Sequence, residues 1–278
     1  MRRWLLTVTV ALLAACSSTA SVRTAATSAP AAPAAPVRIT STTTSTTSAP
    51  STTSTTVTTS TTVTPTTQAG ATLHKVMIVG DSIMFVTSKY QEQRFRAAGL
   101  QVVNESFPGT SVLGRTNVTP TFRAVVAEEK PDVVIAEYSG VYLPPYPKGP
   151  DGLDLAVATP PWWDAWAASA AQATRDLASQ GARVYWVLLP HDRITWANHD
   201  TRMDDLYAAL AAELPNVGLI DWRWAVSGVF GAPVDRLPIG PHGALAPVRG
   251  ADGFHFSEPA SDVLAGVTVA TVLHDYGR

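Results

Sequence analysis

Two short motifs far apart in the chain carry residues that could perform nucleophilic chemistry. The first reads "GDS", Gly80–Ser82, and follows the apolar run "KVMIV". A serine is a weak nucleophile until a base takes its proton, and that base is usually a histidine oriented by a carboxylate. The structural alternative is a tight turn into a helix, with Asp81 or Ser82 as the N-cap. This motif alone does not separate the two interpretations.

The second motif reads "DGFH", Asp252–His255, and supplies a base with an acid to orient it. Of the six histidines, His255 stands out because Asp252 precedes it by three residues around a glycine, with a helix expected just after. This spacing lets the carboxylate reach one ring nitrogen while the other faces outward. The alternative is a surface turn that caps the following helix.

Short β-rich runs alternate with longer segments whose apolar residues recur every three or four positions. The expected strands are 75–80, 100–104, 132–138, 183–189 and 217–222. The expected helices are 82–98, 119–130, 162–180, 201–214 and 258–274. This order predicts an α/β fold with a parallel sheet covered on both faces. Ligands bind at the carboxyl ends of such strands, where Ser82 would stand at a helix N-terminus that favours an oxyanion.

Together, "GDS" after the first strand and "DxxH" before the last helix resemble the SGNH (GDSL-like) hydrolases. The resemblance extends in element order over 75–276. It implies a flavodoxin-like three-layer α/β sandwich. It also implies a catalytic triad without metal or cofactor, in which Ser82 is the nucleophile, His255 the general base and Asp252 its orienting acid.

The same resemblance implies backbone donors for an oxyanion hole. Ser82 supplies one, and Gly109, in "ESFPGTSV" after the second strand, supplies another. The family's G-x-N-D block falls on residues 139–142, which places Gly140 in the hole and Val141 where the family has asparagine. Because a valine side chain cannot donate a hydrogen bond, two interpretations stay open. One is an enzyme with fewer donors, and the other is a non-catalytic glycan-binding or scaffold module.

The first quarter of the chain indicates export and tethering. Residues 1–15 combine two arginines, a short apolar run and small residues, which is typical of a secretory signal peptide. They lead into Cys16, the only cysteine, which resembles the lipidated cysteine of bacterial lipoproteins. The alternative is an ordinary cleavage site with an incidental cysteine. Residues 16–72 form the expected disordered linker, since 22 of the 27 residues in 41–67 are Ser or Thr.

The remaining segment, 73–278, is long enough for one domain with a full core. It holds all 22 acidic residues against 16 of the 20 Lys and Arg, a formal charge of −6. A mildly acidic domain without basic clusters argues against nucleic acid as a partner. Six tryptophans near expected strand ends or helix starts form either a sugar-stacking wall or part of the core. They are Trp162, Trp163, Trp166, Trp196, Trp222 and Trp224.

The sequence therefore predicts a lipid-anchored, extracytoplasmic serine esterase. Its expected substrates are O-acyl groups, mainly O-acetyl, on cell-envelope glycans, and they would react through an acyl-enzyme on Ser82. An acyltransferase with the same triad and the non-catalytic module are the alternatives. We expect a monomer that meets the membrane only through its lipid anchor.

Replacing the expected lipidation site, Cys16→Ser, should release the protein from membranes. A single acyl chain gives only marginal anchoring, whereas several acyl groups on one cysteine anchor stably. Immunoblots of membrane and soluble fractions, wild type against variant, measure the change. A variant that stays quantitatively with the membranes would place the anchor elsewhere.

Overall fold

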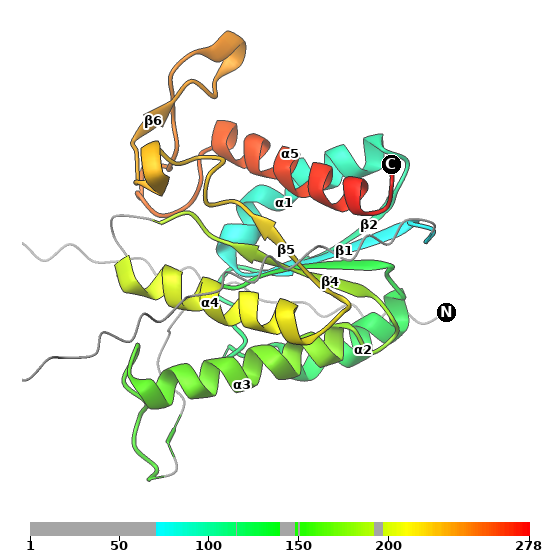
Figure 1. Ribbon diagram of the computed structural model, residues 1–278, viewed down its shortest axis with the longest axis vertical. Helices are drawn as coiled ribbons and strands as arrows, with labels where there is room; N and C mark the ends of the chain where they lie inside the picture. The colour runs from blue at the N-terminus through cyan, green and yellow to red at the C-terminus, as the bar shows by residue number, and fades with distance from the viewer. Residues whose placement is uncertain (1–70, 115, 140–147, 150, 192–196) are drawn as a thin grey trace, which may run out of the picture. The chain divides into compact units, whose positions relative to one another are not determined.

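A five-stranded parallel sheet forms the centre of the computed structural model, which describes residues 71–278 except 115, 140–147, 150 and 192–196. Its strands are β1 (Lys75–Gly80), β2 (Gln101–Ser106), β3 (Val133–Glu137), β4 (Arg183–Leu188) and β5 (Val217–Asp221). They lie in the order β2-β1-β3-β4-β5 (Figure 1). This is the flavodoxin-like order of doubly wound sheets, so the predicted fold class is confirmed. The expected signal peptide, Cys16 and the linker up to residue 70 lie outside the described residues.

Five α-helices cover the two faces of the sheet in the described part of the chain. They are α1 (Ser82–Ala97), α2 (Thr119–Glu129), α3 (Pro160–Leu177), α4 (Ala197–Glu213) and α5 (Glu258–Asp275). Helices α1 and α5 pack on one face, and α2, α3 and α4 cover the other (Figure 1). None of the described helices combines the length and the apolar character that a membrane span needs.

Each strand serves both layers of the core, because successive side chains point to opposite faces of the sheet. In β1, Val76 and Ile78 pack against α1 and α5, while Met77 and Val79 pack on the side of α2, α3 and α4. All four side chains are fully buried. A strand that is covered on both faces must be apolar throughout, which explains the uninterrupted run before "GDS".

The observed elements agree with the expected ones to within a few residues, and one small motif was missed. Helix α3 begins at Pro160 rather than at 162, because proline fits the first turn of a helix. The missed motif is an antiparallel pair of two-residue strands, β6 (Arg236–Leu237) and β7 (Ala246–Pro247). Two short 3₁₀-helices lie beside it, η1 (Val229–Gly231) and η2 (Pro241–Gly243). Elements of two or three residues are too short to show periodicity in a sequence.

Most of the tryptophans belong to the core and do not form a sugar-stacking wall. The four that are buried are Trp162, Trp163, Trp166 and Trp222. The rings of Trp162 and Trp166 stack with their centroids 5.2 Å apart. Trp224 is 62% exposed, and Trp196 lies outside the described residues. The core alternative is confirmed for the four buried rings.

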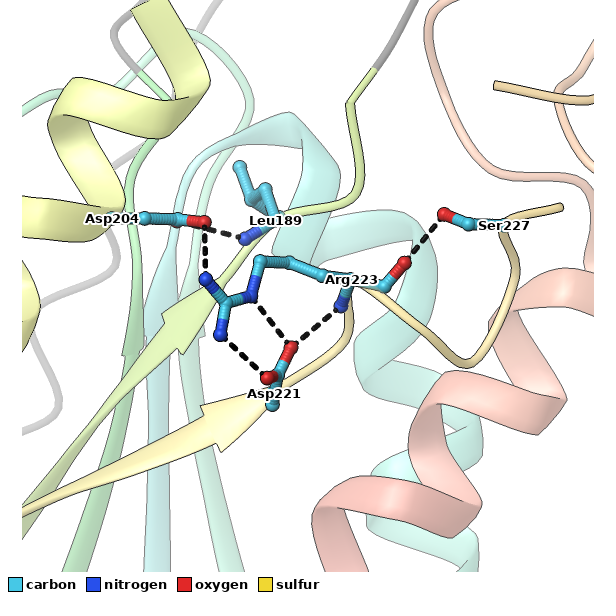
Figure 2. A network of polar contacts seen from close by, with 5 residues as sticks. All are labelled: Leu189, Asp204, Asp221, Arg223 and Ser227. Atoms are coloured by element: carbon cyan, nitrogen blue, oxygen red, sulfur yellow. Dashed lines mark hydrogen bonds and ion pairs between the residues drawn. The ribbon is translucent and has the colours of Figure 1, made fainter. Parts of the chain in front are cut away.

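An ion-pair network fixes the loop that leaves β5 (Figure 2). The Arg223 guanidinium donates to both oxygens of Asp221, at 2.9 and 2.7 Å. It also lies 3.6 Å from buried Asp204 of α4, which in turn accepts the backbone N–H of Leu189 at 3.2 Å. The hydrogen bonds with Asp221 raise the pKa of Arg223. The network anchors the start of the segment that leads through β6 and β7 to Asp252.

Gly80→Ala should destabilise the fold at the junction of β1 and α1. A methyl group at this position would lie 2.4 Å from Met84 Cβ and 2.6 Å from the carbonyl oxygen of Glu137. The clash with a strand backbone should cost about 1–3 kcal/mol of unfolding free energy, measured by denaturant titration. Gly266→Ala is the matched control, because its new methyl group meets nothing closer than 3.9 Å. This control lies inside α5 and should gain about 0.5–1 kcal/mol. Equal effects of the two substitutions would contradict the close-approach argument.

Candidate active site

The turn between β1 and α1 presents Ser82 at the carboxyl edge of the sheet. Asp81 is the N-cap of α1, and its Oδ1 accepts the backbone N–H of Ile83 at 2.8 Å. Ser82 is the first residue of the helix and is half-buried. Of the two N-caps that the sequence allowed, the structure has Asp81. The hydroxyl of Ser82 is therefore not used in capping.

The structure brings Ser82, His255 and Asp252 together, although 173 residues separate the serine from the histidine. Ser82 Oγ lies 2.8 Å from His255 Nε2. His255 Nδ1 lies 2.6 Å from Asp252 Oδ2. With its proton on Nδ1 and facing the carboxylate, the imidazole has a lone pair on Nε2 that can accept the hydroxyl proton. This geometry is that of a serine nucleophile with a base and an orienting acid.

Hydrogen bonds within its own loop hold the Asp252–His255 motif in shape. Asp252 Oδ1 accepts the backbone N–H groups of Phe254 at 2.9 Å and His255 at 3.0 Å, which leaves Oδ2 for the ring. Gly253 has a φ of +72°, a left-handed conformation that strains residues with a side chain. The N–H of Gly250 donates to the carbonyl of His255 at 2.8 Å and closes the loop.

Arg249 connects this loop to the sheet, and sequence reasoning missed it. Its guanidinium donates to the carbonyl of Phe254 at 2.7 Å and to that of Pro190, which follows β4, at 3.3 Å. It also lies over the ring of Phe256, 4.0 Å from the centroid. A single arginine outside the motif carries no signal in the sequence, because its partners are backbone carbonyls.

The base and its acid are open to solvent. The side chain of His255 is 32% exposed and that of Asp252 is 52% exposed. The hydrogen bond from His255, assisted by the N–H of Phe254, lowers the pKa of Asp252 to about 2. Asp252 is therefore ionised at neutral pH, as a group that orients and stabilises an imidazolium must be. No cluster of three or more metal-ligating side chains occurs among the described residues.

The first turn of α1 leaves one backbone donor beside the Ser82 hydroxyl. The first N–H groups of a helix have no partner within it. Here the N-cap takes the N–H of Ile83, and Glu137 Oε2 accepts the N–H of Met84 at 2.9 Å. Within the described residues, the N–H of Ser82 meets no acceptor. It can therefore donate to an oxyanion at the positive end of the helix dipole.

The loop after β2 brings Gly109 to the same edge of the sheet. The N–H of Phe107 and the hydroxyl of Thr110 each donate to the carbonyl of Gly80, both at 3.0 Å. The loop that contains Gly109 is thus tied to the residue that opens the "GDS" motif. The third expected oxyanion-hole residue, Gly140, lies outside the described residues, as does Val141, which stands where the family has asparagine. The contribution of Gly140 stays a prediction.

The sequence matches a family model described as "Protein of unknown function (DUF459)" over residues 75–271. The chain belongs to the DUF459 family. The matched segment includes both motifs and every strand of the parallel sheet. No curated protein matches the chain significantly.

Several solved structures resemble this DUF459 chain. The crystal structure of TesA is 20% identical, with a TM-score of 0.50, and the match covers 73% of this chain and 99% of that one. A lipase/acylhydrolase from Enterococcus faecalis is 16% identical, with a TM-score of 0.50 and coverages of 72% and 95%. A protein of the G-D-S-L family from Desulfitobacterium hafniense DCB-2 is 14% identical, with a TM-score of 0.51 and coverages of 70% and 98%. The likeness shows that the DUF459 chain has the SGNH/GDSL fold.

Asp252→Asn should slow the reaction of Ser82 with a fluorophosphonate probe by as much as about 10⁴-fold. The amide would favour the imidazole tautomer that carries its proton on Nε2, where it cannot accept the proton of Ser82. Mass spectrometry of the labelled peptide over time gives the rate. Asp151→Asn is the matched control, since Asp151 is also exposed and also holds a local turn, at Leu153. Equal labelling rates for the two variants would remove Asp252 from the site.

Proposed function

We propose that the protein is a serine ester hydrolase in which Ser82, His255 and Asp252 form the catalytic triad. The observation that carries this proposal is the hydrogen-bonded line from Ser82 Oγ through the His255 ring to Asp252, with distances of 2.8 and 2.6 Å. The proposal is supported by the position of Ser82 at the carboxyl edge of the parallel sheet, where ligands of such folds bind.

Acylation would begin when Nε2 of His255 takes the hydroxyl proton and Ser82 Oγ attacks the ester carbonyl. The negative charge that develops on the carbonyl oxygen would be held by the N–H groups of Ser82 and Gly109. The imidazolium, held by the ionised Asp252, would then protonate the leaving alcohol. The products of this half-reaction are the free alcohol and an acyl ester on Ser82.

Deacylation would repeat these steps, with water or a sugar hydroxyl as the attacking group. His255 would take a proton from water, the resulting attack would break the acyl ester, and the proton would return to Ser82. If a sugar hydroxyl replaced the water, the same residues would perform acyl transfer. Hydrolysis and transfer thus differ only in which acceptor the site admits.

The substrate class that we propose is an O-acyl, mainly O-acetyl, group on a cell-envelope glycan. The exposure of His255 and Asp252 supports this choice, since an open site admits an ester carried on a polymer. Phe107, beside Gly109, is 53% exposed and offers a ring against which a sugar can pack. The expected signal peptide, Cys16 and linker would hold the domain outside the cytoplasm, on a membrane, within reach of such a glycan.

A non-catalytic glycan-binding module is the second candidate, and Val141 favours it. Losing one oxyanion donor typically costs about 10²–10³ in rate, so valine in place of asparagine would weaken an esterase severely. Intact Ser82, His255 and Asp252 oppose this candidate, because a binding protein has no need for an aligned triad.

Ser82→Ala should abolish the release of acetate from small aryl acetates and from O-acetylated glycans. Triad members act as a unit, so loss of the nucleophile costs several orders of magnitude in kcat. Acetate release and fluorophosphonate labelling of the purified protein measure the change. Ser179→Ala, an exposed serine in the loop before β4, is the control.

Two outcomes would overturn the proposal. A Ser82→Ala variant that hydrolyses esters at the wild-type rate would remove this serine from the chemistry. A wild-type protein that is neither labelled nor hydrolytic, yet binds O-acetylated glycan, would establish the binding module instead.

A further inference from the structure

Two carboxyl groups lie fully buried beneath Ser82, and the proposed reaction uses neither of them. Asp81 and Glu137 both have no exposed surface. They come from neighbouring strand ends, since Gly80 of β1 pairs with Glu137 of β3. The backbone N–H of Asp81 donates to the carbonyl of Glu137 at 3.3 Å. The pair therefore lies at the junction that carries the nucleophile.

Donors surround the Asp81 carboxyl on both oxygens. Oδ1 accepts the N–H of Ile83 at 2.8 Å. Oδ2 accepts the N–H of Ser139 at 2.9 Å and its hydroxyl at 2.7 Å. Hydrogen bonds of this kind favour the charged form of a carboxyl group. Asp81 is thus the member of the pair that is built to be ionised.

The Glu137 carboxyl has fewer such donors than that of Asp81. Its Oε2 accepts the N–H of Met84 at 2.9 Å, whereas no donor among the described residues reaches its buried Oε1. The Asp81 and Glu137 carboxyl groups also lie close enough for each to affect the pKa of the other. Ionised carboxylates only accept hydrogen bonds, so a bond between two carboxyl groups requires a proton on one of them. Oε1 of Glu137 is the oxygen with room for that proton.

No cation among the described residues contributes to the shift in the pKa of Glu137, so nothing there offsets a second negative charge. The described titratable groups that face Glu137 are Asp81, Tyr138, which directly follows β3, and Tyr207 of α4. Tyr207 donates its hydroxyl to the carbonyl of Tyr138 at 2.9 Å. Burial, and then the charge of Asp81, raise the pKa of Glu137 well above its ordinary value of 4.5. Burial also raises the pKa of Asp81, although its donors oppose this.

We propose that Glu137 is a positioning residue that remains a neutral carboxylic acid and donates from Oε1 to the Asp81 carboxylate. The shared proton joins the end of β3 to the start of α1 and so fixes Ser82 and its N–H. The inference depends on the proposed function only for its effect on rate. The protonation state and its effect on stability can be measured without a substrate.

The pH dependence of stability follows from the direction of the shift. The unfolded chain loses the Glu137 proton near pH 4.5, while the folded chain keeps it to a higher pH. The contribution of Glu137 to the free energy of unfolding is therefore fully present below pH 4.5. It is lost as the pH rises toward the pKa of Glu137 in the folded chain. One proton of difference changes the folding equilibrium constant about tenfold per pH unit in this window.

Glu137→Gln tests the protonation state, because glutamine can donate to Asp81 but cannot ionise. Denaturant unfolding of the full-length wild type and the variant at a series of pH values gives the ratio of their folding constants. We expect this ratio to rise in favour of Glu137→Gln by about tenfold per pH unit above pH 4.5. Glu128→Gln, which removes an exposed carboxyl from α2, controls for the loss of a negative charge.

Infrared spectroscopy of the native protein at neutral pH supplies a test that does not depend on unfolding. Wild type should show the carbonyl stretch of a protonated carboxyl, and Glu137→Gln should lack it. A flat stability ratio together with an unchanged spectrum would show that Glu137 is ionised, and the proposal would be wrong.

The positioning role is tested by comparing Glu137→Gln with Glu137→Met, which has a similar size and no donor. The glutamine variant should keep kcat within a few-fold of wild type, while the methionine variant should lose at least about tenfold in kcat with a smaller change in KM. Equal kcat values for two folded variants would overturn the positioning role. If wild-type protein hydrolyses no ester, the proposed function fails, and the rate of Ser82 labelling by the fluorophosphonate probe replaces kcat in this comparison.

Discussion

The burial of the Asp81 carboxyl group is the constraint on which the rest of the site depends. An ionised carboxyl removed from water costs several kcal/mol unless donors replace its hydration. The donors here come from Ile83 of α1 and from Ser139, two residues after the end of β3. They can meet only when β1, β3 and α1 hold one register. Gly80 permits this close approach, since a side chain there would collide with the backbone of β3.

This constraint also decides which helix donors remain for chemistry. A helix N-terminus offers several N–H groups, and any of them could bind an anion. Asp81 and Glu137 occupy those of Ile83 and Met84. The remaining N–H belongs to Ser82, beside its own hydroxyl. The proposed nucleophile and one proposed oxyanion donor therefore lie on the same residue because of how buried carboxyl groups cap the helix.

The sequence was sufficient to predict the sheet, the helices and the three residues of the proposed triad, because both signals are local. Apolar periodicity marks buried strands, and a glycine between Asp252 and His255 marks a turn. Glu137 escaped prediction because a single acid at the end of an apolar strand looks like the strand's exposed edge. Arg249 escaped because its partners are carbonyl groups, which every residue has. Contacts of these two kinds depend on tertiary packing and leave no pattern in the sequence.

The two halves of the site differ in how they are held. Ser82 is held by the buried carboxyl groups of Asp81 and Glu137, whereas His255 and Asp252 lie on a loop that is open to solvent. Solvent weakens the attraction between the carboxylate and an imidazolium, because interactions between charges scale inversely with the local dielectric constant. A bound molecule that covers the loop would expel this water and strengthen the pair just as charge develops on the ring. For the proposed esterase, His255 and Asp252 would therefore gain most from a substrate broad enough to cover both residues, such as an ester carried on a polymer.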